Sequence, residues 1–237
     1  MKIGIMQPYF FPYLGYFQLI SAVDKWVVFD TPQYIRHGWI NRNRILKPDR
    51  NDFQYVNVPL KKHAREAVIN QVQISDAENW RARIIGQVGH YKKAAPFYTD
   101  THKIIEQSIA IETESIVELN CNVLQTICAY LGVEFNYEVY SAMNLEHETP
   151  QHAGEWALHI SSALGAKTYI NPPGGKAIFN KSQFDAAGIE LCFIEPRLKA
   201  YNQKNNSFIP GLSIIDVMMF NSKEQVKEML KEYDLTY

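Results

Sequence analysis

The chain is poor in cysteine, in net charge and in long apolar runs. Its 237 residues include three cysteines, an odd number in apolar contexts, which indicates reduced core thiols rather than a disulfide framework. A formal net charge of −1 gives no overall attraction to nucleic acid or to an anionic membrane. No apolar run approaches the length of a membrane span, and the N-terminus lacks the pattern of a signal peptide. We therefore expect a cytoplasmic protein that neither binds nucleic acid nor inserts into a membrane.

The rest of the composition is that of an ordinary globular protein. Hydrophobic residues make up 46% of the chain and charged residues 21%, which suits one large domain. There is no internal repeat and no low-complexity segment. Aromatic residues make up 13%, including 14 tyrosines, and tyrosine in loops is suited to stacking on sugars or bases and to hydrogen bonding with them.

Short apolar runs alternate with helical periodicities along the chain. They predict strands at 2–6, 25–30, 54–58, 135–140, 167–171 and 189–195, and helices at 14–22, 76–94, 99–109, 113–131, 151–164, 180–187, 212–220 and 222–232. Alternating strands and helices imply a parallel sheet with crossover helices. We predict a single α/β domain over 1–237 with a Rossmann-like parallel sheet, a helical insertion at about 76–132 and a C-terminal helical tail at about 212–237.

The loop after the first predicted strand is rich in aromatic residues. Ligands of open parallel sheets bind at the carboxyl ends of the strands, and this loop leads into a helix whose N-terminus is free to hold an anion. Gly15, in the first turn, would let a ligand approach closely. Gln7, Tyr13 and Tyr16 interrupt the apolar run and are predicted to line the reacting pocket. Alternatively, Gly15 allows helix–sheet packing and the aromatic residues belong to the core.

The loop that follows the predicted strand 167–171 is a candidate phosphate site. Gly174 and Gly175 expose backbone N–H groups, and Lys176 adds a point charge. The pattern matches neither GxxxxGK[ST] nor GxGxxG. A plain turn before a helix is the alternative.

A polar segment with apolar flanks is a third candidate. Asn41, Arg42 and Arg44 stand close together, and a forked guanidinium group can bind phosphate or carboxylate. The neighbouring Trp39-Ile40 and Ile45-Leu46 indicate a segment held in place. The alternative is an exposed loop with solvated charges.

Two further groups of residues carry competing interpretations. His152, Glu155 and His159 are spaced so that one helix face could present all three to a metal, although a solvated polar face explains them as well. Asn205, Asn206, Ser213 and Asp216 lie near the start of the helix at 212–220. Ser213 fits a helix cap, and a buried Asp216 would need a partner such as an arginine.

Four blocks of the sequence resemble the WbqC-like family of bacteria. They are MQPYFFPYLGYFQLI, GWINRNRI, the PGGK loop and FIPGLSIIDVMMFNS, and the likeness covers nearly the whole chain. The family is associated with genes for O-antigen and other surface polysaccharides. The resemblance implies a cytosolic protein that acts on sugar nucleotides or on their acyl groups, and it supplies no catalytic mechanism.

A weaker likeness connects the chain to the nucleotidylyltransferase superfamily. There, an HxGH motif opens the first helix, and Tyr13-Leu14-Gly15-Tyr16 occupies that place here. The resemblance implies a nucleotidylyltransferase-like sheet. Because both histidines are replaced by tyrosines, neither position offers a cation to a triphosphate. This departure removes the support that the motif would give to ATP chemistry, so the sequence names no cofactor and ATP is one option.

The leading hypothesis is a transferase or ligase that attaches an acyl or aminoacyl group to a nucleotide-linked amino sugar. Its substrate would be a small molecule, a sugar nucleotide. One alternative is a non-catalytic protein that binds a sugar nucleotide or acts as a scaffold, and another is a metal-dependent hydrolase. The catalytic candidates are Gln7, Tyr13 and Tyr16, and the substrate-binding or phosphate-binding candidates are Gly15, Asn41, Arg42, Arg44, Gly174, Gly175 and Lys176.

Overall fold

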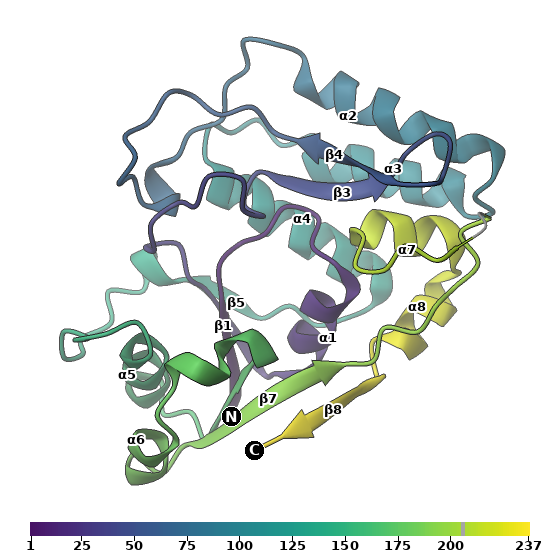
Figure 1. Ribbon diagram of the computed structural model, residues 1–237. Helices are drawn as coiled ribbons and strands as arrows, with labels where there is room; N and C mark the ends of the chain where they lie inside the picture. The colour runs from purple at the N-terminus through teal and green to yellow at the C-terminus, as the bar shows by residue number, and fades with distance from the viewer. Residues whose placement is uncertain (205–206) are drawn as a thin grey trace.

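A mostly parallel sheet of six strands organises the chain, which a computed structural model describes over residues 1–204 and 207–237. Asn205 and Asn206 lie outside the described residues. The sheet order is β5-β2-β1-β6-β7-β8 (Figure 1), and each neighbouring pair is parallel except β7 and β8. The strands are β1 (Lys2–Met6), β2 (Lys25–Val28), β5 (Tyr137–Val139), β6 (Thr168–Asn171), β7 (Glu190–Pro196) and β8 (Tyr233–Thr236).

The order of the strands reverses between β1 and β6. From β1 the chain adds β2 and β5 on one side, and it then returns to add β6 and β7 on the other. This is the arrangement of a doubly wound α/β sheet. The predicted Rossmann-like α/β fold is confirmed.

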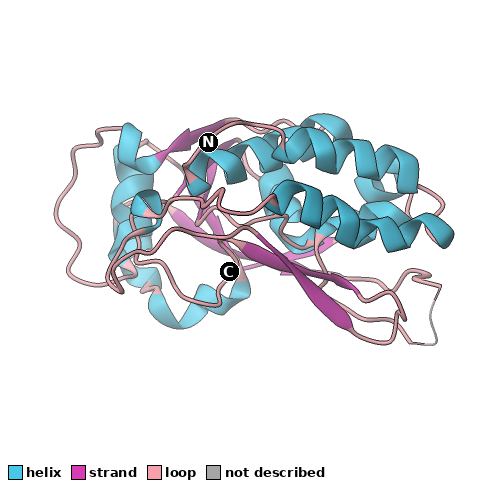
Figure 2. Cartoon of the chain, turned by 90° about the horizontal axis from the view of Figure 1, so that it is seen from above, coloured by secondary structure: helices cyan, strands magenta, loops and turns pink. Residues whose placement is uncertain are grey.

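Helices cover both faces of the sheet, and Figure 2 shows them on either side of the strands. One face packs against α1 (Leu14–Ala22), α4 (Ile116–Leu131), α7 (Ile214–Phe220) and α8 (Lys223–Met229), and the other against α5 (Glu155–Ala163) and α6 (Lys181–Ala186). Ile5 and Val27 face the second group, whereas Trp26 and Val28 face the first. The strands are therefore apolar on both sides, which explains their continuous apolar runs. None of the helices described is both long and apolar enough to cross a membrane.

The segment between β2 and β5 contains a β-hairpin as well as helices. The hairpin pairs β3 (Arg42–Leu46) with β4 (Phe53–Asn57), and β3 was expected to be a loop. Short 3-10 turns follow at η1 (Ile69–Gln71) and η2 (Gly89–Lys93), with helices α2 (Trp80–Val88) and α3 (Tyr98–Ile109) on either side of η2. Helix α2 starts four residues later than predicted, because the Asn79 side chain caps it by accepting from the Ala82 N–H at 3.1 Å.

The end of the chain differs from the prediction in its last element. The predicted helices are present as α7 and α8, and Ser222 and Gln225 form the predicted capping box. The final strand β8 was not predicted. It pairs antiparallel with β7 and so occupies an otherwise open sheet edge. Two more 3-10 turns, η3 (Tyr140–Ala142) and η4 (Pro173–Ile178), follow β5 and β6.

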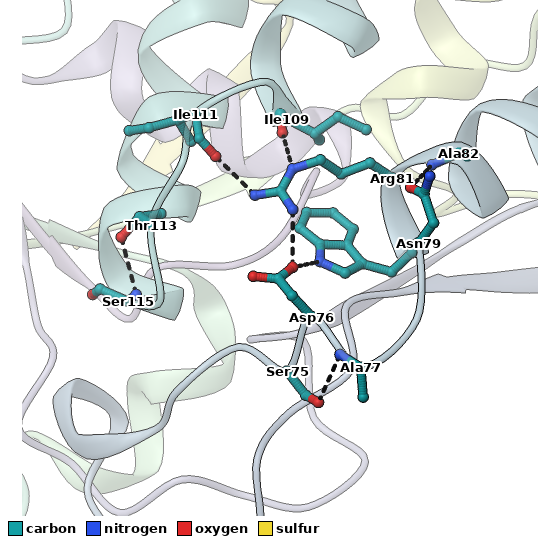
Figure 3. A network of polar contacts seen from close by, with 11 residues as sticks. Ser75, Asp76, Ala77, Asn79, Arg81, Ala82, Ile109, Ile111, Thr113 and Ser115 are labelled. Atoms are coloured by element: carbon teal, nitrogen blue, oxygen red, sulfur yellow. Dashed lines mark hydrogen bonds and ion pairs between the residues drawn. The ribbon is translucent and has the colours of Figure 1, made fainter.

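Arg81 joins the start of α2 to the loop between α3 and α4 (Figure 3). Its guanidinium donates to the carbonyls of Ile109 and Ile111, both at 2.8 Å, and to the Asp76 carboxylate at 3.0 Å. The same Asp76 oxygen accepts from the Trp80 indole at 2.8 Å, and the Arg81 guanidinium lies 4.2 Å from the centre of the Trp80 ring. One side chain thus satisfies the carbonyl at the end of α3 and holds two helices together.

We expect Arg81→Ala to lower the free energy of unfolding by about 2 kcal/mol, because two partly buried carbonyls lose their donor. Arg81→Lys should recover little of this loss, since a single ammonium cannot reproduce the fork. Urea unfolding measures both, with Lys103→Ala on the exposed side of α3 as the control. A lysine variant as stable as the parent would show that charge alone matters.

All three cysteines are free and buried. Burial raises the pKa of the Cys121 and Cys128 thiols to about 12 and that of Cys192 to about 11. The thiolate is the reactive form. Urea-unfolded protein should therefore react with Ellman's reagent at pH 8 within minutes and release three equivalents of thionitrobenzoate. The folded protein should not react over the same time. Rapid labelling of one thiol in the folded protein would contradict this expectation.

Candidate functional site

A cavity of about 420 Å³ lies at the carboxyl ends of β1 and β6, where the strand order reverses. This is the position at which open α/β sheets bind their ligands, and the volume is typical of small-molecule sites. The loops after β1, β2 and β6, the first turn of α5 and the end of η4 enclose it. The lining residues are Ile5, Met6, Gln7, Tyr9, Phe29, Thr31, Pro32, Ala153, Trp156, Ala157, Tyr169, Asn171, Ile178 and Phe179.

Aromatic rings form one wall of the cavity. Phe29 and Trp156 pack with their ring centroids 5.5 Å apart, and Tyr140 contacts them from behind at 5.4 and 5.7 Å. The Tyr140 hydroxyl lies 2.7 Å from Nε2 of His147, whose Nδ1 lies 2.7 Å from the Glu148 carbonyl. Because a carbonyl can only accept, Nδ1 carries a proton and donates to Glu148, while Nε2 is within hydrogen-bonding distance of the Tyr140 hydroxyl. The wall is thus a preorganised surface for stacking.

Uncharged polar groups complete the lining. The Thr31 hydroxyl oxygen is buried without a hydrogen-bond partner, and the Gln7 amide has none among the described residues. The Asn171 amide is oriented by the Tyr169 hydroxyl at 2.7 Å. Burial, and to a smaller extent Tyr13, raises the pKa of Tyr9, so its hydroxyl stays neutral at pH 7. Within the described part of the chain, no charged side chain lines the cavity.

The three predicted catalytic residues occupy different environments. Gln7 lines the cavity. Tyr16 lies in the core, 2% exposed, and its hydroxyl donates to the Gln7 carbonyl at 2.8 Å. Tyr13 precedes α1 and bridges to Ser213 of the C-terminal segment. Tyr16 therefore positions Gln7, and Tyr9, from the same loop, lies at the cavity.

The N-terminus of α1 is covered by protein, so the expectation that it is free to hold an anion is wrong. A Cβ at Gly15 would lie 2.4 Å from the Tyr13 ring. The first-turn residues Leu14, Gly15 and Tyr16 are all buried. Gly15 therefore makes room for the Tyr13 ring rather than for a ligand.

The polar groups of Asn41, Arg42 and Arg44 are already engaged with protein. Asn41 accepts from the Tyr34 hydroxyl and donates to the Val58 carbonyl, both at 2.8 Å. Arg42 donates to the carbonyls of His37 and Gly38 and lies over a tyrosine ring. Arg44 donates to the Gly211 carbonyl at 3.0 Å and lies over the rings of Trp39 and Phe53. None of the three lines the cavity.

The glycine loop after β6 adjoins the cavity, but its predicted site residues do not line it, and only Asn171 before it and Ile178 and Phe179 after it do. Gly174, Gly175 and Lys176 lie in η4. A Cβ at Gly175 would come within 2.1 Å of the Asn171 amide, so this glycine lets the loop approach a lining residue. Lys176 forms an exposed ion pair with Glu195 at 2.7 Å.

The histidine face of α5 is not arranged as a metal site. His152 pairs with Glu155 at 3.3 Å, while His159 Nδ1 lies 2.8 Å from the Glu148 carbonyl. The described residues contain no group of three His, Cys, Asp or Glu side chains that could hold a metal ion. The arrangement required by the hydrolase alternative is therefore not formed by these residues.

Asp216 has partners other than the expected arginine. It is fully buried and accepts from the hydroxyls of Tyr91 at 2.7 Å and Tyr201 at 2.6 Å and from the Gln203 amide at 2.8 Å. Ser213 is the cap of α7, as predicted, and accepts from the Ile215 N–H at 3.2 Å. Among the described residues no cation pairs with Asp216, and the three side chains that donate to it are all neutral.

Comparison with known proteins places the chain in a family. The model of the WbqC-like protein family matches residues 7–228. The chain belongs to this family. It is similar to the uncharacterized protein Rv1507c of Mycobacterium tuberculosis, with 26% identity and 97% of each chain covered. No solved structure matches it.

The cavity of this WbqC-like protein lies almost wholly within the matched range. Of the lining residues, those from Gln7 to Phe179 fall inside it, and only Ile5 and Met6 precede it. Neither Thr31 nor Trp156 was among the predicted site residues. Their positions did carry a signal, because Thr31 directly follows the strand predicted at 25–30 and Trp156 adjoins Glu155.

Proposed function

We propose that this WbqC-like protein binds a nucleotide-linked amino sugar in the cavity and attaches an acyl or aminoacyl group to it in the biosynthesis of a surface polysaccharide. The observation that carries the proposal is the cavity at the point where the strand order reverses. The uncharged polar lining of the cavity suits a polar, uncharged ring. The resemblance to a family associated with polysaccharide genes supplies the class of substrate.

The lining groups support recognition of a sugar or base ring. Phe29 and Trp156 offer an apolar surface for one face of the ring. Thr31 and Gln7 hold polar atoms without partners among the described residues, and such groups gain most from a ligand that completes their hydrogen bonds. A hydroxyl or N-acyl oxygen of the sugar fits both.

The transfer requires little beyond positioning and charge stabilisation. The amine nitrogen of the sugar attacks the carbonyl carbon of an activated acyl donor, such as a thioester. A C–N bond forms, the C–S bond breaks, and the amine proton passes to the departing thiolate. The Gln7 amide and the Tyr9 hydroxyl are neutral donors that would orient the acyl oxygen.

The test is a mass measurement on the sugar nucleotide. The protein is incubated with a UDP-linked amino sugar and either acyl thioesters or ATP with amino acids. We expect one combination to add the mass of an acyl or aminoacyl group. Absence of product from every donor, with sugar nucleotide still bound, would reject the transferase and leave the binding function.

Binding without catalysis is the second candidate, and one observation favours it. The described lining residues include no carboxylate, histidine or lysine that could act as a general base. A protein that only holds the sugar nucleotide, or presents it to a partner enzyme, needs no such group. Product formation that is lost in Gln7→Ala would rule this candidate out.

A further inference from the structure

Two loops beyond the carboxyl end of β2, residues 33–38 and 61–66, form what we call the basic loops. Four hydrogen bonds to backbone carbonyls, each 2.9 Å long, hold the two loops and the residues next to them together. The Tyr34 N–H donates to Ala67 and the Gln33 side-chain amide to Arg65. The Ile69 N–H donates to Pro32 and the Asn70 N–H to Asp30. Figure 1 shows this part of the chain in dark blue at the left, above α5. The loops therefore present a single surface.

The basic loops concentrate positive charge in a chain whose formal net charge is −1. They contain four lysines or arginines and two histidines against one acid, Glu66. Lys61 is paired with Glu114 at 2.8 Å. The exposed side chains of Arg36, Lys62 and Arg65 have no ion-pair or hydrogen-bond partner among the described residues. Such a local excess of unpaired cations attracts a polyanion.

The surface begins at the wall of the cavity. Thr31 and Pro32 line the cavity, and the chain continues from them into the first basic loop. Arg36 thus stands four residues after Pro32 of the cavity wall. The cavity itself has no charged lining among the described residues, so an anionic part of the ligand has to lie outside it.

Arg42 holds the first basic loop in shape. Its guanidinium donates to the carbonyls of His37 and Gly38 and lies 4.2 Å from the centre of the Tyr55 ring. His37 has a φ of 65°, a left-handed conformation that is unfavourable for a residue with a side chain. By fixing two successive carbonyls, Arg42 stabilises that turn and thus the position of Arg36.

We infer that the basic loops bind the diphosphate of the ligand whose ring enters the cavity, with Arg36, Lys62 and Arg65 as the binding cations and Arg42 as a positioning residue. The inference rests on the proposed function and adds the phosphate-binding surface to it. The predicted phosphate ligands Arg44 and Lys176 are engaged elsewhere, with Gly211 and Glu195.

The test compares two triple variants that change the net charge equally. Arg36→Gln/Lys62→Gln/Arg65→Gln removes the three cations, and Lys92→Gln/Lys93→Gln/Lys103→Gln removes three exposed cations from η2 and α3. Calorimetry measures binding of a UDP-linked amino sugar at several salt concentrations. We expect the first variant to bind roughly tenfold to a hundredfold more weakly, with a flatter salt dependence, and the control to bind like the parent.

Two additional ligands separate failure of the inference from failure of the proposed function. N-acetylglucosamine, followed by saturation-transfer NMR, tests the cavity alone and should bind the parent and both variants alike. If the sugar binds and the first triple variant binds the nucleotide as tightly as the parent, the inference is overturned and the cavity assignment stands. If neither ligand binds the parent, the proposed function fails as well.

A phosphatidylglycerol vesicle tests the other source of phosphate. Ile35, within the first basic loop, is 64% exposed, a feature that a membrane surface could also use. We expect no more vesicle binding by the parent than by the first triple variant at physiological salt. Vesicle binding that requires the three cations, without nucleotide binding, would replace the soluble diphosphate with a lipid headgroup and overturn the inference.

Discussion

Replacing Asp216 with alanine should lower the free energy of unfolding by about 3 kcal/mol, the largest stability effect that we expect from a single polar side chain. Three buried donors, from Tyr91, Tyr201 and Gln203, converge on this carboxylate, and each left without an acceptor costs about 1–3 kcal/mol. Removal of a buried charge offsets part of the loss. Chemical unfolding measures the change.

Asp216→Asn and Asp185→Ala are the matched comparisons. The asparagine keeps the shape and one acceptor oxygen, so it should be less damaging than the alanine. Asp185 is exposed and paired only with Lys181 on α6, and its loss should change stability by less than about 0.5 kcal/mol. An Asp216→Ala variant as stable as the parent would show that the hydrogen bonds to Asp216 make no net contribution to the free energy of unfolding.

Asp216 should also make the stability of the protein depend on pH. Burial raises the pKa of Asp216, and the hydrogen bonds from Tyr201, Tyr91 and Gln203 oppose that rise only in part. The carboxyl group therefore binds its proton more tightly in the folded state than in the unfolded state. This tighter proton binding stabilises the folded protein fully at a pH below the ordinary pKa of an aspartate. The stabilisation is lost as pH rises through the folded-state pKa of Asp216. The stability advantage of the parent over Asp216→Asn should thus be larger near pH 4 than at pH 8, and an advantage that grows with pH would contradict the raised pKa.

Filling the cavity should produce the largest effect on ligand binding. Ala157, on α5, lines the cavity and is 5% exposed. In Ala157→Phe the added ring takes the space of the ligand ring, and we expect the affinity for a UDP-linked amino sugar to fall roughly a hundredfold or more. Because the ring enters an existing space, the free energy of unfolding should change by no more than about 1 kcal/mol.

Ala163→Phe is the control for this substitution, because Ala163 is exposed on the same helix. It should leave binding unchanged. Thr31→Val tests whether the Thr31 hydroxyl binds the ligand. This unpartnered buried hydroxyl destabilises the unliganded protein, so the valine should raise the melting temperature while weakening binding. Full affinity in Ala157→Phe would mean that the ligand binds elsewhere.

The apolar strands and the main helices could be predicted because their signals are local. A strand buried on both faces is a short continuous apolar run, and Ile3–Ile5 and Trp26–Val28 show this pattern without reference to any partner. Gly165 and Gly188 carry a similarly local signal, because each follows a predicted helix and precedes a predicted strand, and both have the positive φ of a C-terminal helix cap. Gln7, which directly follows the first strand, was predicted as a site residue and lines the cavity, and its role in a functional site remains a prediction.

The strands β3 and β8 could not be predicted because each depends on a partner. The polar segment Arg42–Leu46 is extended because it pairs with β4, whose aromatic residues Tyr55 and Phe53 lie under the guanidinium groups of Arg42 and Arg44. The segment Tyr233–Thr236 is a strand because β7 offers it an edge. Neither pairing leaves a signal in the segment itself.

By itself, the sequence determined the Rossmann-like fold class and the family, and it singled out the loops at the strand ends as the region of the site. The tertiary structure decided which side chains in those loops are free. Arginines that look like an anion clamp in the sequence bind backbone carbonyls and aromatic rings, and the glycine that might admit a phosphate admits the ring of Tyr13. The physical reason is that helix and strand formation depend on neighbours in sequence, whereas the availability of a polar group depends on which distant atoms have already satisfied it.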